Sequence, residues 1–194
     1  MTRQLVLCST SRYRRDLLSR LQLPFDCAAP HVDESPLPEE TAAALTERLA
    51  QAKTQVLAQR YPDALLIGSD QAASLDGHIL GKPGSRERAF AQLQAASGHE
   101  VEFHTAVAVL DTASGHHHSA RDVTRVRFRV LTDRDIAHYL DRESALDCAG
   151  SFKCEGLGIS LFDAIDSRDP TALVGLPLIV TTRLLRSFGL DPLG

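Results

Sequence analysis

The strongest constraint on the fold is a short apolar run at residues 64–67 (ALLI), which leads directly into Gly68, Ser69 and Asp70. Such a run predicts a buried strand of an α/β sheet, a class that usually places its chemistry at the edge where strands end. We therefore expect this strand to deliver Asp70 to a sheet edge as a catalytic carboxylate. The alternative is that Asp70 only ends the strand as a turn or capping residue.

After this strand, the chain should bring a positively charged side chain back near the carboxylate. The dipeptide Asp76-Gly77 is typical of a tight hairpin turn, and the chain then reaches Lys82 between Gly81 and Pro83. The hairpin would place an acid and a fixed cation close together.

Composition limits the class of protein. A chain of 194 residues with 43% hydrophobic content predicts a single domain or two closely fused lobes with a sizeable core. With the strand and helix patterns described below, we expect one α/β domain, residues 1–194. The net charge of -4 provides no global field for nucleic-acid polymers or anionic membranes, so an anionic ligand must be bound by local cations. The four cysteines form no CxxC pair, and the apolar runs at 5–8 and 173–180 are too short for a signal sequence or a membrane span. We expect a cytoplasmic protein.

The first strand and helix predict a phosphate site. Residues 4–9 read as a strand, and Ser9 begins a run of hydroxyl side chains before a helix at 12–21. Arg14 shares the inward stripe of that helix with its leucines. Hydroxyl groups, a helix N-terminus and an inward guanidinium suit a phosphate, although Arg14 could also snorkel to solvent.

Two further segments carry charges that need an explanation. The loop between Pro30 and Pro36 contains Asp33 and Glu34, which suit Mg²⁺ or are solvated loop acids. Lys53 falls within the apolar stripe of a helix at 42–60, so it needs an anion or a route to water.

The second informative stretch is residues 148–158 (CAGSFKCEGLG). Its three glycines permit tight turns, and Lys153 and Glu155 would lie on the same side of an extended segment. This is typical of a ligand loop; the alternative is a turn with a solvated ion pair. The neighbouring Lys153 also raises the question of a reactive thiol at Cys154.

Four segments occur together in this order: 9–15 (STSRYRR), 32–34 (VDE), 68–71 (GSDQ) with 81–83 (GKP), and 150–156 (GSFKCEG). As a set they resemble the Maf family of nucleoside triphosphate pyrophosphatases, from the first strand to the last helix. The resemblance implies an elongated mixed β-sheet flanked by helices, with two lobes and a cleft, related to the inosine triphosphate pyrophosphatases and generally homodimeric. It also implies hydrolysis of a nucleoside triphosphate to the monophosphate and pyrophosphate with a divalent metal, Mg²⁺ or Mn²⁺.

Three residues are similar to the YceF branch, which acts on 7-methyl-GTP: Tyr13, Gln71 and Glu155. Tyr13 would stack on the cationic methylated base, Glu155 would accept hydrogen bonds from guanine, and Gln71 would shape the pocket. Arg12, where the family usually has proline, and Cys154, where serine is common, depart from the pattern.

The resemblance and the residue chemistry together assign the remaining roles. Asp70 would hold or deprotonate the attacking water and Glu34 would help to carry the metal, although the two could exchange these roles. We expect catalysis by Asp70, Glu34 and Lys82, metal binding by Glu34 and Asp70, and phosphate binding by Ser9, Arg14, Lys53 and Lys153. The alternatives are a pyrophosphatase for another nucleotide such as UTP or dTTP, a metal-dependent phosphomonoesterase, or a non-catalytic nucleotide-binding regulator of cell division.

Overall fold

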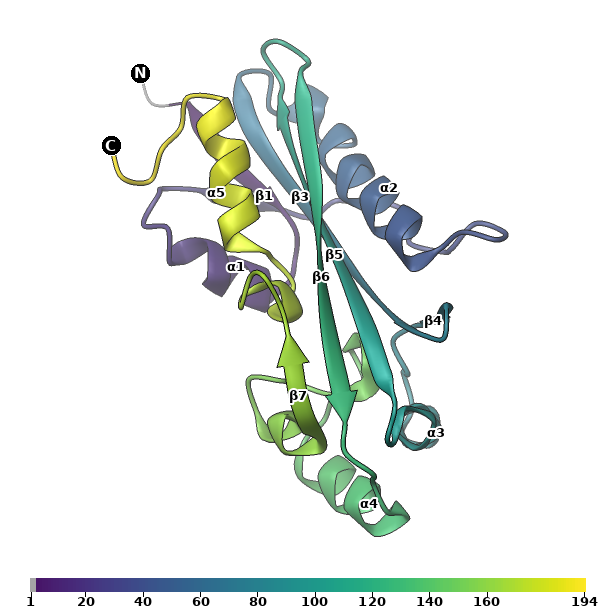
Figure 1. Ribbon diagram of the computed structural model, residues 1–194. Coiled ribbons are helices and arrows are strands. Elements are labelled where there is room, and N and C mark those ends of the chain that lie inside the picture. Colours follow the sequence, from purple (N-terminus) through teal and green to yellow (C-terminus); the bar gives the residue numbers. More distant parts are fainter. Residues whose placement is uncertain (1–2) are drawn as a thin grey trace.

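The computed structural model describes residues 3–194 and contains a mixed seven-stranded sheet flanked by helices (Figure 1). The order is β2-β1-β3-β5-β6-β7, with β4 paired to β3. The strands are β1 (Gln4–Cys8), β2 (Asp26–Ala28), β3 (Ala64–Leu75), β4 (His78–Leu80), β5 (Glu100–Asp111), β6 (His117–Phe128) and β7 (Phe162–Asp166). The helices are α1 (Arg12–Ser19), α2 (Ala42–Gln55), α3 (Arg86–Ala96), α4 (Asp133–Arg142) and α5 (Leu178–Ser187). The predicted α/β class with a mixed, helix-flanked sheet is confirmed.

Three strands of 12 residues each, β3, β5 and β6, run along the length of the molecule (Figure 1). They are antiparallel to one another, whereas β1 runs parallel to β2 and β3. At one end, α1 and α5 lie on one side of the sheet and α2 lies on the other, while α3 and α4 lie at the opposite end (Figure 1).

Two large core clusters divide the molecule along these strands. The first joins α1 and α5 to the sheet through residues such as Leu17, Ile67 and Leu185. The second joins α3 and α4 to the far half of the sheet through residues such as Phe103 and Ile136. These clusters correspond to the two predicted lobes, and both contribute to the walls of the cavity described below.

The prediction that the strand ends at Asp70 is wrong, because β3 continues to Leu75 and Asp70 lies in its middle. The strand persists because β5 pairs with it along this whole stretch. On the other side, β1 ends at Cys8, and Leu7↔Ile67 is the last pair between β1 and β3. The polar residues of β3 therefore begin where its neighbour ends, which opens that side of the strand.

Two local expectations also need correction. Helix α2 ends at Gln55 rather than near residue 60, and a 3₁₀ turn at Ala58–Arg60 precedes Pro62, consistent with the bias against helix before proline. The segment around Lys153 and Glu155 is not extended, because residues 154–156 form a turn.

Candidate active site

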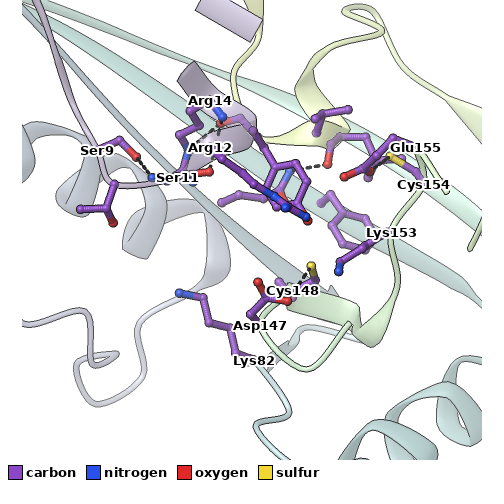
Figure 2. A pocket seen from close by; sticks show the side chains of 18 of the residues that line it. Ser9, Ser11, Arg12, Arg14, Lys82, Asp147, Cys148, Lys153, Cys154 and Glu155 are labelled. Atoms are coloured by element: carbon purple, nitrogen blue, oxygen red, sulfur yellow. Dashed lines mark hydrogen bonds between the residues drawn. The ribbon is translucent and has the colours of Figure 1, made fainter. Parts of the chain in front are cut away.

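An open cavity of about 500 Å³ lies beyond the end of β1, within the usual range for ligand pockets (Figure 2). Its walls come from residues 8–14, 147–149, 152–155 and 173–175, with Pro30, Glu34, Lys53, Gln71, Lys82 and Phe103 between them. Arg14, Lys82 and Lys153 come from three different segments and surround it (Figure 2). Segments far apart in the sequence therefore supply several cations to one space.

Lys53 is the central charge of the site. Its ammonium lies 2.6 Å from Asp70 Oδ1 and 2.6 Å from Glu34 Oε1, and the residue is only 3% exposed. It therefore does not snorkel to bulk water. Lys82 Nζ lies 3.8 Å from the other oxygen of Glu34, so the chain of charges continues to the cavity rim.

Close packing of α2 on β3 brings Lys53 over Asp70. At Gly68 the two elements approach so closely that a Cβ atom would lie 2.1 Å from the carbonyl oxygen of Ala50. Glycine is required there because no side chain fits between strand and helix. Asp70 is two residues further along β3, is 7% exposed and accepts a hydrogen bond from the Lys53 ammonium. It is not among the cavity-lining residues, whereas Lys53 and Glu34 are.

The charges around Glu34 change its acidity. Partial burial raises the pKa of its carboxyl, but the hydrogen bond and charge of Lys53, with Lys82 and Arg14, outweigh burial and hold the pKa below its usual value. Glu34 is therefore ionised at neutral pH.

Arg14 is partly buried and faces the cavity, as its helical stripe predicted. Its Nε donates to the Gly175 carbonyl at 2.8 Å, which fixes the guanidinium. Burial lowers its pKa, against the opposing charges of Asp70 and Glu34, but an arginine remains cationic. Within residues 3–194 its terminal nitrogens make no hydrogen bond to protein, so they are free to donate to an anion.

The other predicted ligands lie around the same cavity with some of their groups already engaged. Ser9 Oγ accepts from the Ser11 amide at 3.1 Å. The Lys153 ammonium donates to the Ser144 carbonyl. The side-chain amide nitrogen of Gln71 donates to Thr105 Oγ1, Ala172 O and Leu173 O. Gln71 therefore links β3 to the segment at residues 172–175, part of which lines the cavity.

Tyr13 lines the cavity, but a neighbour occupies one of its faces. The Arg12 guanidinium carbon lies 4.8 Å from the centre of the ring, and its Nη2 donates to the Tyr13 hydroxyl at 2.9 Å. A base that stacks on this face must displace Arg12.

The cysteine that sequence reasoning left open has no activated thiol. Burial, with the nearby Glu155 charge, raises the pKa of Cys154 to about 12. Its thiol donates to Glu155 Oε2 at 3.4 Å. Cys154 therefore lines the cavity as a neutral thiol and is not ionised at neutral pH.

Comparison with known proteins places this architecture. The family described as Maf-like protein matches residues 4–188. The chain belongs to the Maf family. A Maf relative named 7-methyl-GTP pyrophosphatase, from Xanthomonas oryzae pv. oryzae, is 60% identical over 97% of this chain and 98% of its own length. Another of the same name, from Burkholderia pseudomallei, is 57% identical over 96% of this chain and 88% of its own length. Among solved structures, the Ham1 protein of Staphylococcus aureus aligns with a TM-score of 0.47 and 12% identity, covering 64% of this chain and 71% of that one.

Sequence reasoning missed several parts of this Maf site. Phe103 and Phe152 form an aromatic wall with ring centres 5.2 Å apart, and Asp147 lies on the rim. Phe152 lies within the glycine-rich segment 148–158, but no periodicity in that segment marks it as a cavity-lining ring. Gly175, whose carbonyl accepts a hydrogen bond from Arg14, has a φ of 119°. Gly175 itself and Pro177, two residues later, were the sequence signs of a turn there.

Two carboxylates of this Maf protein lie on either side of one positive charge. Asp70 and Glu34 converge on the single ammonium group of Lys53, which offsets part of their negative charge. Within residues 3–194 no group of three or more acidic, histidine or cysteine side chains could hold a metal. Two carboxylates suit Mg²⁺, which keeps several waters and shares substrate phosphates.

Proposed function

We propose that this chain is a nucleoside triphosphate pyrophosphatase that hydrolyses 7-methyl-GTP to 7-methyl-GMP and pyrophosphate. The observation that carries the proposal is the Lys53 ammonium bridging Asp70 and Glu34 at a cavity that Arg14 and Lys82 also line. A triphosphate brings about four negative charges near neutral pH, and one divalent cation offsets only two of them. The names of the relatives support the same substrate.

The chain's own residues supply positioning and charge, the main requirements of phosphoryl transfer. A divalent cation, Mg²⁺ or Mn²⁺, held by Glu34 and Asp70, would offset phosphate charge and make water more acidic. Arg14 offers its terminal nitrogens to phosphate oxygens, and Lys82 supplies a second cation at the rim.

The reaction adds one water and breaks one bond. Water oxygen attacks the α-phosphorus, the bond from that phosphorus to the bridging oxygen breaks, and pyrophosphate leaves. Asp70 or Glu34 takes the proton of the water, and the two acids remain interchangeable in this role. Ser9, Lys53 and Lys153 complete the proposed phosphate-binding set.

We assign selection of the nucleotide base to residues at the rim of the cavity. Methylation at N7 makes guanine cationic, which favours stacking on Tyr13 once Arg12 has moved. Glu155 is exposed and offers carboxylate oxygens to the N1 and N2 donors of guanine. Because the amide nitrogen of Gln71 is engaged by the scaffold, Gln71 acts as a fixed wall.

The deciding experiment is a screen of 7-methyl-GTP, GTP, UTP and dTTP with both products identified. We expect 7-methyl-GTP to give the highest kcat/KM, and Asp70→Asn to lower kcat by about 100-fold or more, as for loss of a general base. Orthophosphate as the product would indicate a phosphomonoesterase, and binding without turnover would indicate a regulator. Either result would refute the proposal.

Glu155 provides the test of base selection. Glu155→Ala should lower the ratio of kcat/KM for 7-methyl-GTP over GTP, and Glu155→Gln should lower it less because one acceptor oxygen remains. An unchanged ratio in Glu155→Ala would contradict the assignment.

We also propose that the enzyme works as a homodimer in the cytoplasm. No helix within residues 3–194 is both long and apolar enough to cross a bilayer. Strand β7 forms an open edge of the sheet, and Ile165 on it is 40% exposed, which supports a surface for self-association. Light scattering during size-exclusion chromatography measures the mass, and a monomer would refute this part.

A further inference from the structure

Glu34 lies in a segment that has no regular secondary structure of its own. Residues 29–41, between β2 and α2, contain neither helix nor strand. Such a segment loses much conformational entropy when a ligand orders it. Contacts from outside the segment are therefore needed to hold its backbone so that Glu34 stays beside Lys53.

Arg48 on α2 provides that support. Its Nη2 donates to the carbonyl oxygen of Ser35, the residue after Glu34, at 3.1 Å. Its Nε and Nη2 also donate to the two carboxylate oxygens of Glu40, both at 2.7 Å. Glu40 Oε2 in turn accepts from the Leu37 amide at 2.9 Å. The Arg48–Glu40 pair is therefore hydrogen-bonded to the backbone at two residues just after Glu34, namely Ser35 and Leu37.

The pair is well placed to resist motion. The Glu40 side chain is only 7% exposed, and a two-point arginine–carboxylate contact fixes orientation as well as distance. The hydrogen bond from Arg48 lowers the pKa of Glu40 to about 2, so both partners stay charged at neutral pH. Arg48 is five residues before Lys53 on α2. One helix therefore carries both Lys53, whose ammonium contacts Glu34, and Arg48, which with Glu40 forms a clamp on the loop that contains Glu34.

We propose that Arg48 and Glu40 are positioning residues that set the affinity of the active site for its divalent cation, by fixing the loop that carries Glu34. The inference rests on the proposed function in that it takes Glu34 as a cation ligand. Partners that orient a metal ligand typically change affinity by about 10–100-fold when removed. Without the clamp, binding a cation must also order the loop.

The direct test is Mn²⁺ binding, measured by electron paramagnetic resonance without nucleotide. We expect Arg48→Met and Glu40→Gln to raise the Kd for Mn²⁺ by about tenfold. The matched control is Arg125→Met, which removes another arginine–glutamate pair, 3.0 Å from Glu102, on the exposed face of the sheet. It should change the Kd by less than about twofold, since exposed pairs contribute little.

A kinetic measurement separates positioning from general damage. The Mg²⁺ concentration for half-maximal activity should rise by the same factor in Arg48→Met, while kcat at saturating Mg²⁺ stays close to that of the wild type. Arg48→Lys keeps the charge but loses the two-point contact, and it should give an intermediate Kd. This variant decides the question if Arg48→Met does not fold.

The outcomes distinguish this inference from the proposed function. Mn²⁺ affinities of Arg48→Met and Glu40→Gln equal to the Arg125→Met control would overturn the inference, even in a fully active enzyme. Weakened Mn²⁺ binding in a protein that releases no pyrophosphate from any nucleotide would support the clamp and refute the proposed function.

Discussion

Removing the Lys53 ammonium tests the central charge of the site. Lys53→Met keeps the apolar stem but leaves the Asp70 carboxylate, 7% exposed, beside Glu34 without its shared cation. Breaking a buried ion pair by removing one partner costs about 3–5 kcal/mol. Because Glu34 is about half exposed at its side chain and Lys82 lies 3.8 Å away, we expect the lower end, about 3 kcal/mol. For a chain of this size that corresponds to a fall in Tm of about 6–12 °C.

The assay is urea unfolding followed by circular dichroism in EDTA, with Asp70→Asn and the double variant measured alongside. Most of the cost of Lys53→Met comes from the uncompensated buried carboxylate, so adding Asp70→Asn should recover about 2 kcal/mol. Lys82→Met is the control: Lys82 is 65% exposed at its side chain, and its loss should cost less than about 1 kcal/mol. Strictly additive effects of Lys53→Met and Asp70→Asn, or a Lys53→Met variant as stable as the control, would refute the reasoning.

Three further predictions concern packing and acidity. Gly68→Ala should destabilise by about 3 kcal/mol, since its methyl would meet the Ala50 carbonyl, whereas Gly81→Ala, with open space around it, should be neutral; equal unfolding midpoints would contradict this. At pH 7.5, iodoacetamide should label Cys154 far more slowly in the folded than in the urea-unfolded protein, because burial raises its pKa to about 12, and equal rates by mass spectrometry would argue against it. The folded pKa of Glu34 lies below its ordinary value of 4.5, so the stability gap between wild type and Glu34→Gln should persist from pH 7 to 5 and shrink only as the pH falls further; a gap already lost at pH 6 would count against the charge arrangement.

Local signals in the sequence predicted local structure well. The dipeptide Asp76-Gly77 forms the expected hairpin turn, with φ values of 50° and 81°. A second local signal, Thr132 followed three residues later by Asp135, forms a capping box that opens α4 with both of its reciprocal hydrogen bonds. Such features depend on residues within one turn of each other, so their chemistry is fully written in a short segment.

The site itself depended on longer-range information. Sequence reasoning selected Arg14 and Lys53 because charged residues on apolar stripes need a partner, and both line the cavity. It did not predict that Lys53 would stand between Asp70 and Glu34, nor that Arg12 would cover a face of Tyr13. Those contacts depend on how closely helices and strands approach, which no single segment specifies.

The sequence by itself determined the family, the class of the fold and the residue types that a polyanionic substrate requires, because these follow from motif order, periodicity and charge. Only the tertiary structure decided how the side of the strand that carries Asp70 becomes open. Strand β3 does not stop there; β1 ends earlier, at Cys8, and opens the side of a continuous strand. Where one strand ends relative to its neighbour is a property of the assembled sheet, since pairing register is set by contacts between segments about 60 residues apart in the chain.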